Sequence, residues 1–231
     1  MVISILFPAI IFAQNPETVT DTEGNSYSVI SIGEQVWMKE NLRVSRYRNG
    51  DAILTGLPDS SWNKTLLGAW SVYNNDSSMN RIFGKLYNWY AVADPRGLCP
   101  SGWHVPSDKD WIKLEMHLGL PEKDLNKPGR RGAKQNVAGK MQSTGRKSDG
   151  SGYWKEQPEY ANNESGFTGL PGGNRSYKGH YWYMGESGDW WTSSEASSKS
   201  AAWYRLLDVH KRPYRDAISK NFGFSVRCIK D

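Results

Sequence analysis

The stretch Cys99–Gly119, CPSGWHVPSDKDWIKLEMHLG, carries the strongest helix signal of the chain. Ser107 and Asp110 form an S-x-x-D capping box, and acidic residues in a first turn suit the positive end of the helix dipole. Gly119 offers the left-handed position at which helices commonly end. One face of the expected helix is apolar: Trp111, Leu114 and Leu118. The pattern predicts a helix from Asp108 to Leu118.

The same stretch begins with one of the two cysteines of the chain, and Cys228 is the other. A domain of this length can fold without a disulfide framework. In an oxidising compartment a pair of cysteines is typical of a bridge, which here would close a loop of about 130 residues and contribute on the order of 4–5 kcal/mol. Two unpaired buried thiols are the alternative at this point.

Residues 1–14, MVISILFPAIIFAQ, resemble a signal peptide that could be cleaved after the small residue Ala13. The usual basic residues before the apolar run are missing, so the segment could be truncated. The run is about a dozen residues, shorter than the ~20 that span a bilayer. A buried N-terminal strand is the alternative. We expect a secreted or cell-surface protein, not membrane-spanning, with residues 15–231 forming a single domain.

The 231 residues carry a formal net charge of +5 and include 11 Trp, 12 Tyr and 6 Phe. The basic residues are scattered and no nucleic-acid motif is visible, so nucleic acid is not an expected partner. Acidic glycans or an anionic envelope are compatible with the charge. Trp and Tyr in this number suit both a loop-rich core and an exposed recognition face.

Short runs of strand-forming residues, bounded by turn residues, recur along the chain. We expect N-terminal strand hairpins within residues 18–57 and a long surface loop over 58–80. Short helices are expected within 84–92 and within 135–143. From Gly166 onward the pattern predicts short strands separated by glycine turns. The resulting fold class is α+β.

Several motifs occur in a fixed order along the chain. They are Gly33-x-Gln35-x-Trp37-Met38-x-Glu40-Asn41-Leu42, the run Gly84–Val92 (GKLYNWYAV), Cys99–Ser107 (CPSGWHVPS), Asn163–Phe167 (NESGF) with Leu170–Arg175 (LPGGNR), Trp190–Glu195 (WWTSSE) and Gly223–Cys228 (GFSVRC). Together they resemble the Fibrobacter succinogenes major paralogous domain over about residues 18–231. Proteins of that family are secreted or surface proteins of Bacteroidota and Fibrobacterota, often with no assigned activity.

The resemblance implies a C-type-lectin-like fold for residues 84–231, with short antiparallel strands, one or two main helices and long loops. In that fold a long-range disulfide joins the first helix to the last strand, which implies a Cys99–Cys228 bridge. The Gly-Gly-x-Arg and Gly-Phe-x-x-Arg pieces are also similar to the formylglycine-generating branch of the superfold. That activity needs a reactive cysteine pair, and a structural bridge leaves no spare thiol. Fold analogy does not transfer function.

We expect no cofactor. The sugar-binding Glu-Pro-Asn or Gln-Pro-Asp tripeptide of C-type lectins is absent, as is Trp-Asn-Asp. Asn162, Asn163 and Glu164 could ligate a structural calcium ion, which needs six to eight oxygen atoms. A turn rich in Asn accounts for the same residues.

We also expect the protein not to be an enzyme. His104 could act as a base, but a histidine bonded to backbone at a strand-to-helix junction is the simpler interpretation. The chain has no H-x-x-x-H pair and no Gly-x-Ser-x-Gly elbow. Four carboxylates could in principle form a glycosidase pair, as in any secreted domain: Glu164, Asp189, Glu195 and Asp208.

Binding is the remaining function. Aromatic and arginine residues crowd the C-terminal third, and such groups suit stacking on sugars or a protein hot spot. The candidate binding residues are Arg175, Tyr181, Tyr183, Tyr204, Arg205 and Tyr214, while the expected core tryptophans are Trp103, Trp111, Trp190 and Trp191. We predict a non-enzymatic module that recognises a glycan or a surface protein. The rival is a structural envelope or adhesion domain without a ligand pocket.

Overall fold

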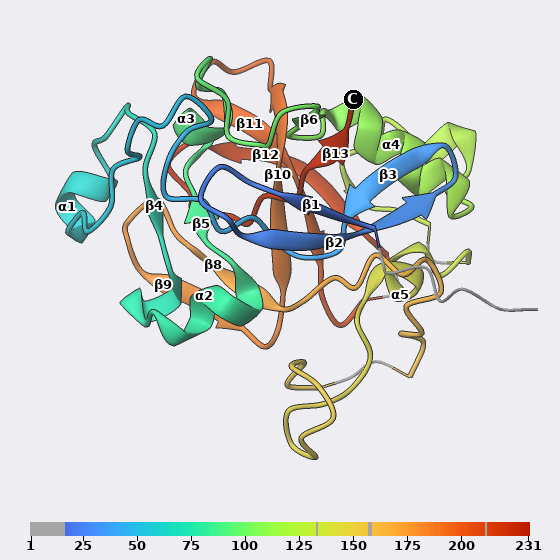
Figure 1. The fold of residues 1–231 in the computed structure, drawn as a ribbon. Coiled ribbons are helices and arrows are strands. Elements are labelled where there is room, and N and C mark those ends of the chain that lie inside the picture. Colours follow the sequence, from blue (N-terminus) through green and yellow to red (C-terminus); the bar gives the residue numbers. More distant parts are fainter. Residues whose placement is uncertain (1–16, 133, 157–158, 211) are drawn as a thin grey trace, which may run out of the picture.

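The computed structural model describes residues 17–132, 134–156, 159–210 and 212–231. Within them, most strands belong to two sheets of five and six strands, and a third sheet has two (Figure 1). The predicted signal peptide, residues 1–14, lies outside the described residues. The described chain is a mostly-sheet α+β fold with short helices, so the predicted fold class is confirmed at this level.

The first sheet has the order β1-β2-β3-β13-β6 and is antiparallel throughout. Its strands are β1 (Thr18–Thr20), β2 (Ser26–Ile32), β3 (Gln35–Met38), β13 (Ile229–Lys230) and β6 (Trp103–His104). The strands β1, β2 and β3 form the two hairpins expected within residues 18–57. The strand nearest the end of the sequence, β13, pairs with β3 on one side and β6 on the other.

The second sheet has the order β7-β12-β11-β10-β8-β9. Its strands are β7 (Gly129–Arg130), β12 (Tyr214–Ser219), β11 (Ala201–Leu207), β10 (Gly188–Glu195), β8 (Gly172–Arg175) and β9 (Tyr181–Met184). The pairs are antiparallel except for β8 with β10, which is parallel. The two-stranded sheet consists of β4 (Trp70–Ser71) and β5 (Leu86–Tyr87). The short strands after Gly166 were therefore predicted correctly.

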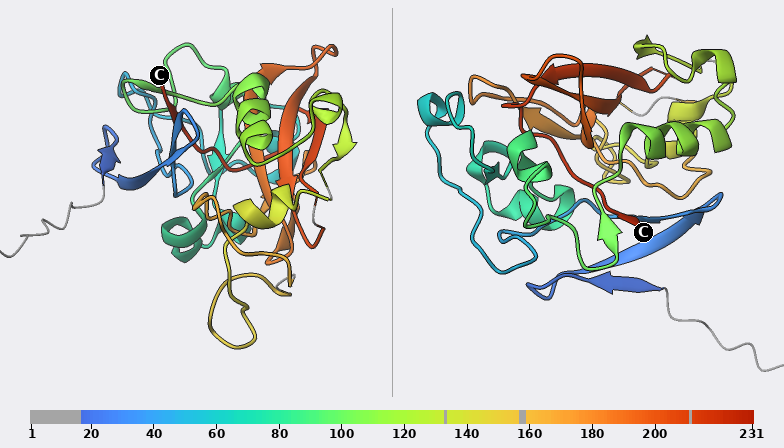
Figure 2. Two further views of the ribbon diagram at one scale, coloured as in Figure 1. Left: turned by 90° about the vertical axis from the view of Figure 1, so that its right-hand side faces the viewer. Right: turned by 90° about the horizontal axis from the view of Figure 1, so that it is seen from above.

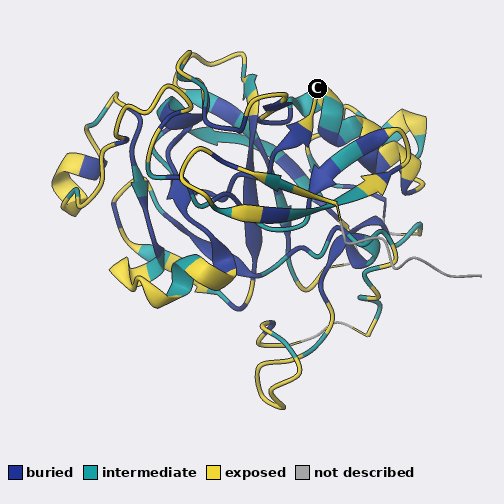
Figure 3. Ribbon diagram, viewed as in Figure 1, coloured by how far each residue is buried: buried dark blue, intermediate teal, exposed yellow. Residues whose placement is uncertain are grey.

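The helices are short and lie around the sheets: α1 (Asp59–Trp62), α2 (Ser78–Phe83), α3 (Trp89–Val92), α4 (Asp108–His117) and α5 (Val137–Met141), with 3-10 turns at Tyr73–Asn75 and Glu122–Asp124. Exposed residues are frequent on α1 and α2, while the strands β8, β10 and β11 of the larger sheet are mostly buried (Figure 3). None of the helices in the described residues is long and apolar enough to cross a membrane.

The predicted helix is confirmed as α4, one residue shorter than expected. The capping box is complete: Ser107 Oγ accepts from the Asp110 amide at 3.2 Å, and Asp110 Oδ2 accepts from the Ser107 amide at 2.8 Å. Gly119 has φ +104°, the left-handed conformation that ends the helix. Seen from above, α4 lies between the hairpins β1–β3 and the strands β11 and β12 (Figure 2).

Trp111 on α4 joins the two large sheets. Its ring lies 5.1 Å from that of Trp37 on β3, 5.6 Å from Phe167 and 6.3 Å from Trp190 on β10. Tilted and edge-on arrangements at these distances are the favourable ones for aromatic pairs. The four tryptophans predicted for the core are all buried: Trp103, Trp111, Trp190 and Trp191. The apolar face of α4 therefore belongs to one of the two buried hydrophobic clusters of the described residues.

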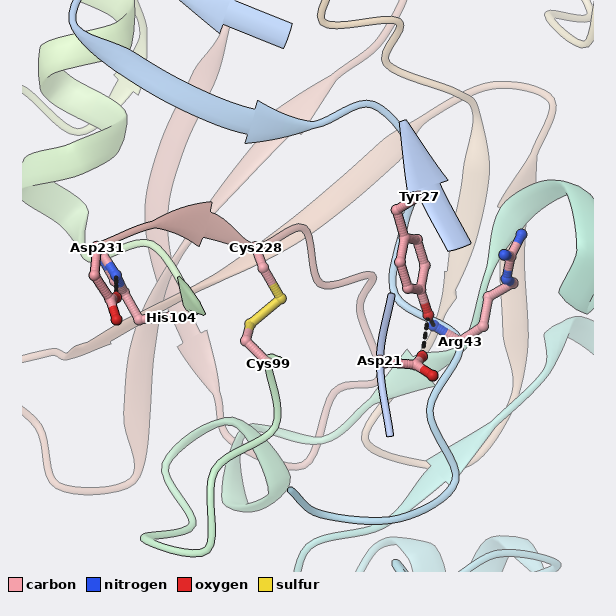
Figure 4. The surroundings of a disulfide bond; sticks show 7 residues. All are labelled: Asp21, Tyr27, Arg43, Cys99, His104, Cys228 and Asp231. Carbon is pink, nitrogen blue, oxygen red and sulfur yellow. Dashed lines mark hydrogen bonds and ion pairs between the residues drawn. A yellow bond between two sulfur atoms is a disulfide. The ribbon is translucent and has the colours of Figure 1, made fainter. Parts of the chain in front are cut away.

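Cys99 and Cys228 form a disulfide bond with a Cα–Cα distance of 6.0 Å across a sequence separation of 129 (Figure 4). Both residues are buried. The predicted bridge is confirmed, and it fixes the start of the CPSGWHVPS segment to the end of the chain beside β13.

A second buried junction brings four distant motif residues together. Arg227 Nη2 donates to Asn41 Oδ1 at 3.0 Å, and its guanidinium lies 4.1 Å from the centre of the Phe167 ring. Asn41 Oδ1 also accepts from Trp190 Nε1 at 2.9 Å. Burial lowers the pKa of Arg227. The motifs around these residues thus contribute to one interior contact.

The surface loop expected over residues 58–80 was wrong. The segment contains α1, β4, a 3-10 turn and the start of α2, and Trp62 is fully buried beneath the guanidinium of Arg175, 4.3 Å from its ring. Elements of two to six residues are too short to establish a hydrophobic period. The helix expected within 84–92 is divided into β5 and α3, while the helix expected within 135–143 is α5.

Candidate functional site

An open pocket of about 580 Å³ lies between the segment that precedes α1, strand β4, the turn before α2 and strand β8. We call it the Trp70 pocket. Its lining residues are Thr55, Gly56, Leu57, Pro58, Asp59, Trp70, Ser71, Val72, Asn75, Ser77, Asn80, Lys85 and Arg175. Most of them lie in residues 55–85, ahead of the C-terminal third in which the aromatic residues led us to expect binding.

The rim of the pocket depends on a tight turn in the 3-10 segment. Asn74 and Asn75 adopt φ values of +53° and +56°, a conformation that Asn tolerates better than most residues. This turn carries Asn75 to the pocket, where its Oδ1 accepts a hydrogen bond from Tyr181 Oη at 2.9 Å. The predicted binding residue Tyr181 therefore holds the rim and does not stand free.

Arg175, also a predicted binding residue, lines the pocket from β8 but is only 2% exposed. Its Nε donates to the Gly179 carbonyl at 2.9 Å, and its Nη2 donates to the Leu57 carbonyl and to Asp59 Oδ1, both at 3.0 Å. The guanidinium lies between the rings of Trp62 and Tyr181. Arg175 therefore ties the 57–59 segment to β8.

Lys85 is a second buried cation at the pocket. Its Nζ donates to the Arg43 carbonyl at 2.5 Å and lies 4.1 Å from the centre of the Trp70 ring. The residue is 6% exposed, and burial lowers the pKa of its ammonium group. The ring of Trp70 partly compensates the buried charge through its negative face.

Three polar atoms of the pocket's lining residues are buried without a hydrogen-bond partner in the described part of the chain: Trp70 Nε1, Ser71 Oγ and Asn80 Oδ1. Buried polar atoms are nearly always paired in folded proteins, and each unpaired one costs about 1–3 kcal/mol. Nine other buried polar atoms of the described residues also lack a partner, but these three belong to residues that line one pocket. Sequence reasoning missed them; isolated tryptophans in the Ser- and Asn-rich segment 58–80 were the available signal.

The other predicted binding residues do not join this pocket. Tyr204 is buried in the core, its ring 5.0 Å from that of Phe224, so its expected exposure was wrong. Tyr214 is half-buried and donates to Asp216 Oδ2 at 2.7 Å. Tyr183 is 56% exposed on β9. The six candidates thus occupy at least three separate places.

Arg205, another predicted binding residue, lies in a buried ion network beneath α4. Its Nε donates to Glu115 Oε1 at 3.0 Å, and its Nη1 donates to Asp108 Oδ1 at 2.9 Å. Arg131 donates to Glu115 at 2.7 Å, and Arg215 donates to Asp108 at 2.7 Å. The side chain of Arg205 is 2% exposed because two carboxylates of α4 neutralise it inside the fold. Its role is to attach the helix to β11.

Tyr183 lines a second open cavity of about 600 Å³. Its φ of +64° is rare for a bulky residue. Three of its four charged lining residues already have partners, since Lys155 pairs with Glu186 at 2.9 Å and Asp208 pairs with Arg130. We therefore regard the Trp70 pocket as the stronger candidate site.

Asp189, one of the carboxylates considered for catalysis, is a buried side chain of β10. It accepts hydrogen bonds from Ser187 Oγ at 2.7 Å and Asn174 Nδ2 at 3.2 Å. Burial raises the pKa of Asp189 to about 7. No ion pair to Asp189 is present among the described residues, so these two hydrogen bonds offset only part of the cost of burying its charge.

The raised pKa predicts a pH-dependent stability. The folded protein binds a proton at Asp189 that the unfolded chain releases near pH 4, so stability from this group is lost as the pH rises from about 4 through 7. Asp189→Asn cannot ionise, and we expect it to raise the free energy of unfolding above that of the wild type at pH 8 but not at pH 4. Urea denaturation at both pH values measures the difference. An equal effect of the substitution at the two values would contradict the assignment.

His104 does not bond to backbone as the sequence suggested. Its Nδ1 lies 2.6 Å from Asp231 Oδ1 (Figure 4), and its Nε2 lies 3.4 Å from Asp110 Oδ2. The side chain is 44% exposed and lines neither of the two larger pockets. It connects the end of the chain to the capping box of α4.

The Asn-rich turn has the geometry that the sequence offered as the alternative to a calcium site. Asn162 Oδ1 accepts from the Glu164 amide at 3.2 Å, and Asn163 Oδ1 accepts from the Thr168 amide at 2.8 Å. Across the described residues, no group of three or more His, Cys, Asp or Glu side chains is placed to hold a metal ion.

Comparison with known proteins identifies the family. The model of the Fibrobacter succinogenes major domain matches residues 30–230, which include both cysteines, α4 and every residue of the Trp70 pocket. No curated protein and no solved structure matches the chain. The family model covers more than half of the sequence and confirms the resemblance seen in the motifs. The chain belongs to the Fibrobacter succinogenes major domain family.

Proposed function

We propose that the protein is a non-enzymatic module that binds a glycan in the Trp70 pocket. The observation that carries the proposal is the set of unpartnered buried polar atoms at that pocket. An indole N–H can only donate and an amide oxygen can only accept, while a hydroxyl does both. A sugar carries many hydroxyl groups, each able to donate and to accept, and so matches a lining that mixes donor and acceptor side chains.

The apolar parts of the lining support the same ligand class. Leu57, Pro58 and Val72 line the pocket together with the ring of Trp70. Small-molecule sites combine such surfaces with a few placed polar groups that fix the orientation of the ligand. A sugar ring presents C–H groups on its faces and hydroxyl groups on its edge, which matches this division.

The proposal includes a secreted or cell-surface location and a C-type-lectin-like core. The Cys99–Cys228 disulfide supports an oxidising compartment, because such bonds are rare where thiols are kept reduced. A disulfide that joins the segment before α4 to the strand β13 supports the lectin-like comparison.

A glycan array with two tryptophan variants tests the proposal. Ser77 is exposed and lines the pocket. The Ser77→Trp variant should therefore have its opening filled and should lose the glycan binding that the wild type shows. Ser78 is the next residue, is equally exposed and does not line the pocket, so Ser78→Trp should bind as the wild type does. Array signal and thermal melting would be measured for all three proteins.

Two results would contradict the proposal. The first is a wild type that binds no glycan on the array, which would favour a structural domain without a ligand. The second is equal binding by the Ser77→Trp and Ser78→Trp variants, which would place the glycan elsewhere on the surface.

A further inference from the structure

We infer that the ligand of the Trp70 pocket is an acidic saccharide, in which a carboxylate is carried beside ring hydroxyl groups. The inference rests on the proposed function and specifies the ligand class. It follows from the charged groups that line the pocket: Lys85, Arg175 and Asp59. Two cations face one carboxylate there, so the lining has an excess of positive charge.

Lys85 retains hydrogen-bond capacity. An ammonium group has three donors. One acceptor lies within hydrogen-bond distance of Lys85 Nζ among the described residues, the Arg43 carbonyl. The two remaining donors belong to a side chain that is 6% exposed, where water is scarce. A buried cation of this kind favours an anionic partner, because charge-assisted hydrogen bonds are about twice as strong as neutral ones.

Arg175 adds a second incomplete cation. Its Nε and Nη2 are bonded, while its Nη1 has no hydrogen-bond acceptor in the described part of the chain. A guanidinium matches the planar geometry of a carboxylate.

The carboxylate of Asp59 does not cancel the two cations. Its side chain is 54% exposed, whereas that of Arg175 is 2% exposed. Water therefore screens the negative charge far more than the positive one. The carboxylate paired with Arg175 thus lies at the solvent edge of the pocket, while the carboxylates that act on Lys85, those of Asp21 and Glu23, lie outside the lining.

Neutral polar groups complete the match to a sugar. Ser71, Asn75, Ser77 and Asn80 line the same pocket and carry hydroxyl or amide groups. A free inorganic anion would use the cations but leave these groups and the ring of Trp70 unused. A saccharide that bears a carboxylate uses both sets. The net charge of +5 would also attract such a ligand from a distance.

The test is isothermal titration with a galacturonic acid trisaccharide and with its methyl ester, which keeps the shape and removes the charge. We expect the wild type to bind the acid at least about tenfold more tightly than the ester, the effect of one charge-assisted hydrogen bond. Lys85→Met keeps an unbranched apolar side chain beside Trp70 and should lose most of this preference. Lys64→Met removes an exposed lysine that does not line the pocket. This variant should keep the preference for the acid over the ester.

The outcomes separate the two levels of the proposal. Equal binding of acid and ester by the wild type would overturn the acidic ligand and leave glycan binding intact. Binding of neither, together with an empty glycan array, would overturn both. Loss of the preference in Lys64→Met to the same degree as in Lys85→Met would indicate general charge attraction and overturn the assignment to the pocket. Inorganic sulfate that matched the trisaccharide in affinity would do the same. The acid–ester comparison on the wild type does not depend on the folding of any variant.

Discussion

Replacing both cysteines with alanine is expected to lower the free energy of unfolding by about 5 kcal/mol. The Cys99–Cys228 bond closes a sequence separation of 129, and a cross-link over so long a loop removes a large share of the conformational entropy of the unfolded chain. Most single domains are stable by about 5–15 kcal/mol, so this loss takes a large part of the total. The double variant should therefore unfold at a much lower urea concentration than the wild type.

Urea denaturation of the oxidised wild type, the reduced wild type and the double alanine variant measures this effect. Reduction should reproduce most of the loss, which separates the cross-link from the change of side chain. The slope of the transition should increase when the bond is absent, because a freer unfolded chain exposes more surface. A double variant within 1 kcal/mol of the wild type, roughly the error between related measurements, would contradict the prediction.

The second large effect is expected for Glu115→Gln, with a loss of about 3–5 kcal/mol. Glu115 is fully buried on α4 and its Oε1 accepts from both Arg131 and Arg205. Glutamine keeps the shape of the side chain but removes the charge. Asp108 would then be the one carboxylate of the network left to neutralise three buried guanidinium groups: those of Arg131, Arg205 and Arg215. Uncompensated buried charge is among the most costly features of a folded protein.

The matched control is Glu122→Gln, which removes an exposed carboxylate from the 3-10 turn that follows α4. It should change the free energy of unfolding by less than about 0.5 kcal/mol. A double variant that also replaces Arg131 with Met should recover part of the loss, because it removes one of the unpaired cations. Equal small effects of Glu115→Gln and Glu122→Gln would show that the network contributes little.

Local signals in the sequence predicted the parts of the fold that depend on near neighbours. The capping box at Ser107 and Asp110 and the glycine at 119 locate α4 to within one residue. The turn residues between β1, β2 and β3 locate the hairpins. Each of these features is decided by residues within a few positions of one another, so no knowledge of the tertiary structure was needed.

Burial of arginine could not be predicted in this way. Arg175 lies in a polar segment and Arg205 in the apolar strand AAWYRLL, and arginine is a mostly exposed residue in folded proteins. Both are buried because partners far away in the sequence neutralise them: Asp59 for the first, Asp108 and Glu115 for the second. The Trp70 pocket has the same origin, since segments around residues 55, 70, 80 and 175 meet there only after folding.

The motifs that indicated the family carry structural information of a related kind. Asn41, Phe167, Trp190 and Arg227 come from four different motifs and meet at one buried point.

The place of β13 in the first sheet has a consequence for how the chain folds. This strand lies between β3 and β6, although about 190 residues separate it from β3. Until residue 229 has been synthesised, the inner edge of β3 has no neighbour and presents open backbone groups that can pair with other chains. Closing the sheet is therefore a late, non-local event, and contacts of such long sequence separation form slowly. The first sheet of this protein is therefore complete only after β13 has been synthesised.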